Sequence, residues 1–203
     1  MKALVIADIQ IDFLPGGKLP VNNGNEIIPV VNQLQLSKRF DLIVATQDWH
    51  PHNHGSFASN YLGKNAFDHI LLGGFDQVLW PNHCVQGSIG AEFPSDLNGN
   101  NIEAIFRKGM DKNIDSYSGF FDNGKKKDTG LAAYLKGRNI DEVFICGLTA
   151  DYCVFFTAMD AVDCGFKTTL IEDATRPIDR ANFIKKLKLL KEKNVSVINS
   201  NIL

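Results

Sequence analysis

The chain has 203 residues, 44% of them hydrophobic, and a formal net charge of -2 at pH 7. This composition suits one domain with a substantial core, and it excludes the basic character of a nucleic-acid-binding protein. No apolar run reaches the roughly 18 residues that a membrane span requires. We therefore expect neither nucleic acid nor membrane as a partner.

The apolar stretch within residues 1–7 ends at Asp8, which makes it too short for a signal peptide, and we interpret it as a buried strand. The four cysteines show no pairwise framework spacing: Cys84, Cys146, Cys153 and Cys164. In a domain of this size such cysteines are expected to be reduced, as is typical of a cytoplasmic protein.

Short apolar runs alternate with amphipathic stretches along the chain. The apolar runs predict strands at Leu4–Ile9, Leu42–Thr46, Ile102–Phe106, Val143–Cys146, Thr168–Ile171 and Val195–Ile198. The amphipathic stretches predict helices at about residues 25–38, 128–138, 151–164 and 180–193. Nearly uninterrupted apolar strands are typical of a parallel sheet covered on both faces. The alternation therefore predicts a three-layer α/β/α sandwich built from β-α-β crossovers.

Residues 49–101 break this alternation. The segment is rich in Gly, Asn, Pro and His, has no clear period, and carries several aromatic residues that argue against disorder. Loops of this length in compact domains are usually functional or disordered. We therefore expect one domain over residues 1–203, with residues 49–101 as an insertion that carries binding sites.

Four of the five histidines lie in two parts of this insertion. His50, His52 and His54 closely follow Asp48, and His83 comes later in the chain. Imidazole nitrogen and carboxylate oxygen are ligands that zinc and similar divalent ions prefer. The sequence therefore predicts a metal site, with a polar loop of surface histidines as the alternative.

The spacing of these residues along the chain indicates which of them can bind one metal ion together. Asp48 and His50 are two positions apart, so an extended segment places both side chains on one face. His83 must return from a distance, and His54 is a possible further ligand. We interpret the two remaining histidines as surface residues: His52 and His69.

Four predicted connections place reactive side chains at the carboxyl ends of strands, where open parallel sheets bind their ligands. These residues are Asp8, Asp48, Lys108 and Cys153. Cys153 falls in the first turn of a predicted helix, where the dipole and the free N–H groups favour a thiolate. Asp8 could serve as its base and Lys108 could compensate the charge. Each residue taken alone also has a structural interpretation, as a buried thiol, a turn carboxylate or a solvated lysine.

Taken together, these segments resemble the nicotinamidase (pyrazinamidase) family of isochorismatase-like cysteine hydrolases. The pairing of Asp-Trp-His-Pro with Trp-Pro-x-His-Cys is specific to the metal-containing nicotinamidase branch. The matching segments run in order over nearly the whole chain: Ala7-Asp8-Ile9-Gln10-Ile11-Asp12-Phe13, Thr46-Gln47-Asp48-Trp49-His50-Pro51, His54-Gly55-Ser56-Phe57-Ala58, Trp80-Pro81-Asn82-His83-Cys84, Lys108-Gly109, Tyr117-Ser118-Gly119-Phe120 and Gly147-Leu148-Thr149-Ala150-Asp151-Tyr152-Cys153-Val154.

The resemblance implies an isochorismatase-like, Rossmann-like fold with a six-stranded parallel sheet. It implies a catalytic triad of Asp8, Lys108 and Cys153. It also implies metal ligands at Asp48, His50 and His83, while His54 matches a ligand in only some members.

The resemblance further implies a substrate site. Phe13, Trp80 and Tyr117 match residues that sandwich a pyridine ring. A cis peptide would join Leu148 to Thr149, and the backbone N–H groups of Thr149 and Cys153 would form an oxyanion hole.

The implied function is that of a nicotinamidase, which hydrolyses nicotinamide to nicotinic acid and ammonia through a cysteine thioester in NAD salvage. The implied cofactor is a divalent metal, Zn²⁺ first, with Mn²⁺ or Fe²⁺ as substitutes. Three alternatives remain open: a related cysteine amidase for another small amide, a non-catalytic metal-stabilised binding protein, and a hydrolase whose metal activates water. The oligomeric state is also open, and a homo-oligomer is compatible with the sequence.

Overall fold

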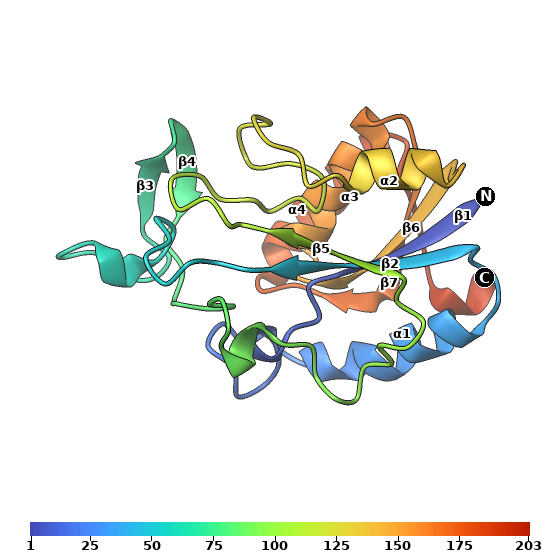
Figure 1. Cartoon of the computed structure of the whole chain (residues 1–203), viewed down its shortest axis with the longest axis horizontal. Coiled ribbons are helices and arrows are strands. Elements are labelled where there is room, and N and C mark those ends of the chain that lie inside the picture. Colours follow the sequence, from blue (N-terminus) through green and yellow to red (C-terminus); the bar gives the residue numbers. More distant parts are fainter.

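A six-stranded parallel sheet lies between helices in the computed structural model, which describes residues 1–203 (Figure 1). Its strands are β1 (Lys2–Ala7), β2 (Leu42–Asp48), β5 (Ala104–Lys108), β6 (Glu142–Leu148), β7 (Lys167–Arg176) and β8 (Ser196–Ile198). The helices are α1 (Ile27–Leu36), α2 (Leu131–Gly137), α3 (Cys153–Asp163) and α4 (Arg180–Glu192). The predicted α/β class and six-stranded parallel sheet are confirmed.

Both faces of the sheet are covered, which explains the uninterrupted apolar runs. In β1, Ala3, Val5 and Ala7 face one core, to which α2, α3 and α4 contribute. Leu4 and Ile6 face a second core with α1 and parts of the insertion. Figure 1 shows α1 alone below the sheet and the other helices above it. Because side chains alternate between faces along a strand, a strand buried on both faces must be apolar at every position.

The strand order β5-β2-β1-β6-β7-β8 reverses its direction of growth between β1 and β6. The crevice beyond the carboxyl ends at such a switch point is where open α/β sheets bind ligands. Gly147 allows the two strands to approach closely there. Its φ is +111°, and a Cβ at this position would lie 2.0 Å from the Ala7 carbonyl oxygen. The segments that follow β1 and β6 are thereby held side by side.

The insertion contains a two-stranded antiparallel hairpin, β3 (His69–Leu72) and β4 (Phe75–Val78), that the sequence analysis did not predict. Gly73 and Gly74, both with positive φ, connect the strands. A Gly-Gly pair is a hairpin signal, but the flanking strands are largely exposed and show no apolar period. Short 3-10 turns complete the chain: Ile11–Phe13, Gly24–Glu26, Ala58–Asn60, Ile89–Ala91 and Ser200–Ile202.

Four of the predicted strands end later than expected, namely β2, β5, β6 and β7. β2 reaches Asp48 and β5 reaches Lys108, and these two residues are register partners in the parallel ladder. Strand pairing therefore extends beyond the apolar runs and includes the polar residues that follow them. Asp48 and Lys108 are thus fixed by the sheet, while the loops only complete their surroundings.

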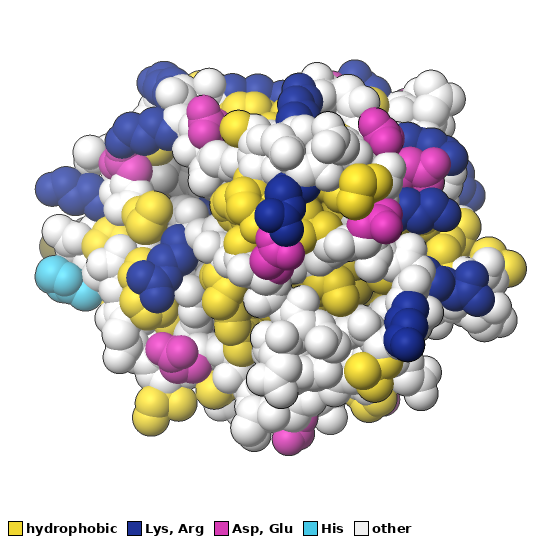
Figure 2. Space-filling model, turned by 45° about the vertical axis from the view of Figure 1, so that its right-hand side comes forward, with side chains coloured by type: hydrophobic (Ala, Val, Ile, Leu, Met, Phe, Trp, Pro, Cys, Tyr) yellow, Lys and Arg dark blue, Asp and Glu magenta, His cyan; other side chains and the backbone are white.

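The surface agrees with the balanced composition. On the face in Figure 2, basic and acidic side chains are interspersed among apolar ones. None of the helices has the length and apolar character needed to cross a bilayer.

Candidate active site

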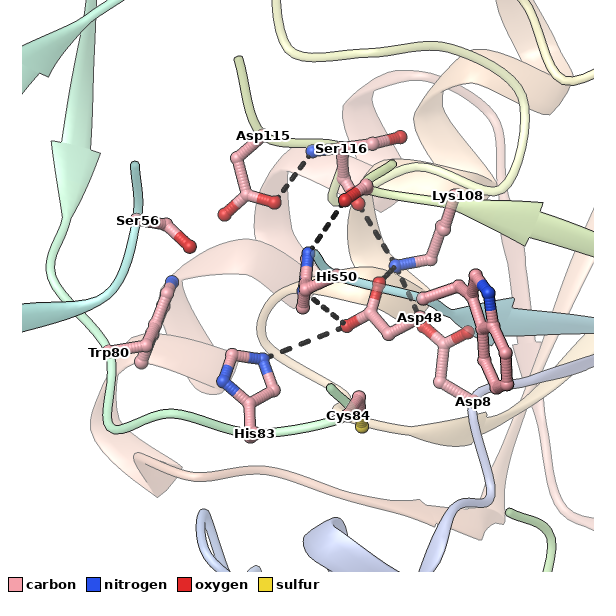
Figure 3. Close-up of polar contacts among 12 residues, drawn as sticks. Asp8, Asp48, His50, Ser56, Trp80, His83, Cys84, Lys108, Asp115 and Ser116 are labelled. Carbon is pink, nitrogen blue, oxygen red and sulfur yellow. Dashed lines mark hydrogen bonds and ion pairs between the residues drawn. The ribbon is translucent and has the colours of Figure 1, made fainter. Parts of the chain in front are cut away.

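Lys108 lies between two carboxylates at the carboxyl ends of neighbouring strands (Figure 3). Its Nζ is 2.9 Å from Asp8 Oδ2, and it donates hydrogen bonds to Asp48 Oδ1 at 2.5 Å and to the Ser116 carbonyl at 2.9 Å. Cys153 Sγ lies 3.5 Å from the same nitrogen. All of these side chains are buried, with 0% exposure for Asp8 and 2% for Lys108. The structure thus brings the three predicted triad residues into one cluster.

Burial and neighbouring charges set the protonation of this cluster. Burial opposes the charge on Lys108, but Asp48 and Asp8 outweigh it and raise the lysine pKa well above its usual value. Burial also opposes ionisation of Asp48, yet Lys108 and His50 hold its pKa far below the usual range. For Asp8, burial prevails over Lys108 and raises the carboxyl pKa. Asp8 is therefore more basic than an ordinary aspartate, as a proton acceptor requires.

Cys153 is the first residue of α3 and is 5% exposed. Burial raises its pKa well above the usual value despite the opposing charge of Lys108. This differs from the thiolate expected at a helix N-terminus, because desolvation and two nearby carboxylates outweigh the dipole. The resting thiol therefore keeps its proton and needs a base to remove it.

Asp8 is placed to be that base. Thr46 Oγ1 donates to Asp8 Oδ1 at 2.7 Å and fixes the carboxylate, while Asp8 Oδ2 is buried and accepts no hydrogen bond of good geometry within the protein. A carboxylate oxygen of Asp8 and the sulfur of Cys153 lie within 4.8 Å of each other. Thr46 thus anchors one oxygen, and the other, which is ion-paired with Lys108, is the one left to accept the proton of the thiol.

Asp48, His50 and His83 form a second cluster, with ligand atoms within 4.8 Å of one another. The Nε2 atoms of His50 and His83 lie 3.6 and 3.8 Å from Asp48 Oδ2. Each Nδ1 lies within 3 Å of a carbonyl oxygen, that of Gly109 for His50 and that of Pro81 for His83. A carbonyl only accepts, so each Nδ1 carries a proton, and in the neutral ring each Nε2 presents its lone pair. Two imidazole lone pairs and a carboxylate fit a divalent metal.

Backbone contacts hold this cluster in place. Gln10 brackets the main chain of Asp48, because its Nε2 donates to the Asp48 carbonyl and its Oε1 accepts from the Asp48 N–H, both at 2.8 Å. Gly109 has a φ of +67°, and a Cβ there would lie 2.4 Å from His50 Cε1. Gln10 was not among the predicted site residues, although it lies in a matched segment.

An aromatic pocket adjoins both clusters. Phe13, Trp80 and Tyr117 line it, as the resemblance implied, together with Thr149 and Cys153. The remaining lining residues include several that the sequence analysis did not propose for this pocket: Leu19, Asp48, His50, His83, Asp115, Tyr152 and Ile178. Tyr117 Oη accepts hydrogen bonds from Gln77 Nε2 at 2.9 Å and Trp80 Nε1 at 3.3 Å, which fixes two of the rings.

Leu148 was predicted to bind substrate, and its side chain does not line this pocket. It is fully buried in the core that contains α1, because it ends β6 facing that side of the sheet. The peptide that joins it to Thr149 is cis, as the resemblance implied. The backbone N–H groups of Thr149 and Cys153 make no hydrogen bond within the protein, so both can donate to a ligand.

Other sequence interpretations concern the surface. His52 and His69 are exposed, as expected, and His69 pairs with Asp76. Two lysines of the exposed basic run at residues 125–127 are ion-paired: Lys125 contacts Asp160 and Asp163, and Lys127 contacts Asp111. All four cysteines are free thiols, as predicted.

The fold and the thiol–carboxylate–lysine cluster are those that the resemblance to isochorismatase-like hydrolases implied. A family model described as Isochorismatase domain matches residues 2–201. The nicotinamidase of Acinetobacter baylyi is 51% identical over 177 residues, which cover 87% of this chain and 82% of the relative. The chain belongs to the nicotinamidase family within the isochorismatase-like superfamily, as predicted.

Solved structures agree with this assignment. A nicotinamidase/pyrazinamidase from Acinetobacter baumanii superposes with a TM-score of 0.96 at 46% identity, covering 100% of this chain and 98% of that one. The pyrazinamidase of Pyrococcus horikoshii in complex with zinc superposes with a TM-score of 0.80 at 36% identity, covering 98% of both chains.

Proposed function

We propose that this protein is a nicotinamidase that converts nicotinamide to nicotinic acid and ammonia in NAD salvage, in the cytoplasm and without a nucleic-acid or membrane partner. One observation carries the proposal: a buried thiol, held beside a carboxylate base and a lysine, lines the same aromatic pocket as the Asp48–His50–His83 cluster. The activity agrees with that of the relatives described above.

The geometry supports the following reaction. Asp8 accepts the proton of Cys153 while the sulfur attacks the carboxamide carbon, and Lys108 stabilises the charges that develop. The N–H groups of Thr149 and Cys153 donate to the oxyanion. Asp8 returns the proton to the amino group, ammonia leaves, and a thioester remains. Asp8 then takes a proton from water, which attacks the thioester; nicotinic acid leaves, and Asp8 returns the proton to the sulfur of Cys153, which restores the thiol.

Asp48, His50 and His83 would hold the divalent metal, for which we propose zinc on the basis of this donor set and the zinc-bound structural relative. A bound divalent metal supplies a Lewis acid that can orient a ring nitrogen. Phe13, Trp80 and Tyr117 would hold the ring itself, so the carboxamide faces Cys153.

A substrate series tests the proposed function. We expect ammonia release from nicotinamide with a kcat/KM at least about tenfold above that of benzamide, which has the same carboxamide but no ring nitrogen. Coupled detection of ammonia would measure both. Turnover of maleamate or a carbamoyl compound without turnover of nicotinamide would favour the related amidase, and binding without any turnover would favour a binding protein.

Removal of the metal should lower activity without unfolding the protein. After treatment with a chelator and desalting, we expect ammonia release to fall by at least about 10²-fold and to recover when zinc is added back. Metal analysis must show that the metal has left, and circular dichroism must show an unchanged fold. Full activity in metal-free protein would refute a role for the metal in the reaction.

A further inference from the structure

Thr149, which directly follows β6, carries a hydroxyl group that has no partner within the protein. The residue is 1% exposed, and its Oγ1 is buried without any hydrogen bond. A buried hydroxyl without a partner costs free energy, and such a group in a native protein is often explained by a catalytic role. Several other buried threonine hydroxyls are bonded within the protein: Thr46, Thr157, Thr168 and Thr175.

The main chain of Thr149 is held firmly beside the nucleophile. Its carbonyl accepts hydrogen bonds from the N–H groups of Tyr152 and Val154, both at 3.1 Å. The next N–H along the chain, that of Ala150, donates to the Arg176 carbonyl at 2.9 Å. These bonds tie Thr149 to the first turn of α3 and to the end of β7, and the residue lines the aromatic pocket. A ligand in this pocket can supply the partner that the protein itself does not.

The hydroxyl proton needs an acceptor, and the reaction supplies one next to Thr149. The carboxamide oxygen is the group to which the Thr149 N–H donates in the proposed reaction. Two of the three staggered rotamers place a threonine hydroxyl next to its own N–H, where both can contact one acceptor. An oxyanion has three lone pairs, so it can accept from the N–H groups of Thr149 and Cys153 and from one further donor.

We propose that the Thr149 hydroxyl is a catalytic group, a third donor to the oxyanion that forms when Cys153 attacks the carboxamide. The inference rests on the proposed function and adds a side-chain donor to the two backbone donors. The hydroxyl keeps its proton throughout, and no bond to it is made or broken. Hydrogen bonds to charged oxygen are stronger than those to neutral oxygen, so the contact stabilises the transition state more than the bound substrate.

Thr149→Val tests the hydroxyl, because it replaces the oxygen with a methyl group of similar size. Removal of one oxyanion donor affects kcat, so we expect kcat for ammonia release to fall by about 10²-fold while KM changes by less than about threefold. Thr149→Ser keeps the hydroxyl and should retain kcat to within about fivefold. An unchanged kcat in Thr149→Val, or a loss in Thr149→Ser as large as in Thr149→Val, would overturn the proposal.

Unfolding of the ligand-free protein distinguishes this role from a structural one. The hydroxyl has no partner to lose, so Thr149→Val should unfold in urea at the same midpoint as the unaltered protein or a higher one. A clearly lower midpoint would assign the hydroxyl a structural role and overturn the proposal. Thr149→Ala, which also lacks the oxygen, gives the same kinetic comparison should the valine variant fail to fold.

Thr168→Val is the matched control. Thr168 is buried at the start of β7, at the opposite end of the sheet from Cys153, and its hydroxyl donates to the Phe166 carbonyl at 3.1 Å. The same replacement there removes a hydrogen bond that the protein does make. It should lower the urea midpoint and leave ammonia release unchanged, which is the reverse of the pattern expected for Thr149→Val.

Inhibition by nicotinaldehyde identifies the substrate atom that the hydroxyl contacts. The aldehyde has the carbonyl oxygen of the substrate but no amino group. If the hydroxyl donates to that oxygen, Thr149→Val should raise the inhibition constant by at least about tenfold, as for loss of a hydrogen bond to a charged group. An unchanged inhibition constant would overturn the assignment, because the hydroxyl would then act on the amino group.

Failure of the inference and failure of the proposed function give different results. If the proposed function is wrong, the unaltered protein releases no ammonia from nicotinamide and forms no adduct with nicotinaldehyde on Cys153. If only the role of the Thr149 hydroxyl is wrong, the unaltered protein does both, and Thr149→Val matches it in kcat and in the inhibition constant.

Discussion

Cys153→Ala is expected to lower kcat/KM for nicotinamide by at least about 10⁴-fold, because no other thiol in the chain can attack the carboxamide. Cys84 and Cys146 are buried, and neither lines the pocket with Cys153. Ammonia release under single-turnover and steady-state conditions would measure the loss. The fold should persist, since a small side chain replaces a small one at the start of α3.

Cys164→Ala is the matched control, because Cys164 lies at the other end of α3, and it should leave ammonia release unchanged. Nicotinaldehyde offers an independent check, since an aldehyde accepts the sulfur but carries no leaving group. Mass spectrometry should find an adduct, stabilised by reduction if necessary, on Cys153 and none in Cys153→Ala. Substantial turnover by Cys153→Ala or Cys153→Ser would refute the nucleophile and favour a metal-activated water.

Lys108→Met should unfold more easily than any surface variant. The replacement keeps most of the side-chain length and leaves Asp8 and Asp48 buried without their shared cation. Removing one partner of a buried ion pair typically costs about 3–5 kcal/mol of unfolding free energy. We expect a loss of that size in urea denaturation of the metal-free protein, together with loss of ammonia release.

A double variant separates charge from packing. Asp8→Asn with Lys108→Met removes one of the two stranded carboxylates, so it should be more stable than Lys108→Met alone, by a coupling that a double-mutant cycle measures. Lys127→Met, at an exposed ion pair, is the control and should cost no more than about 1 kcal/mol. Equal stability of Lys108→Met and the unaltered protein would contradict the assigned cluster.

The sheet and its helices were predictable because burial on both faces leaves a strong apolar pattern. The same pattern placed the predicted ends of β2 and β5 too early, because Asp48 and Lys108 are polar although they still pair with each other in the sheet. Hairpin β3–β4 was missed because most of its side chains are exposed or half-buried and they show no apolar period.

Site residues that belong to a recognisable sequence motif, such as Cys153 and His83, could be predicted. Asp115 was missed because nothing in its local sequence distinguishes a buried carboxylate from a surface one. Only the folded chain places it near His50 and His54. The protonation state of Cys153 could not be predicted from the sequence either, because it depends on burial and on carboxylates from other strands.

Asp48 links the two halves of the site through the two oxygens of one side chain. Oδ1 accepts from Lys108, and Oδ2 faces the imidazoles of His50 and His83. A cation that binds to or leaves His50 and His83 therefore changes how strongly the Asp48 carboxylate attracts the ammonium of Lys108. Exchange between ions of equal valence should therefore disturb the thiol far less than emptying the site.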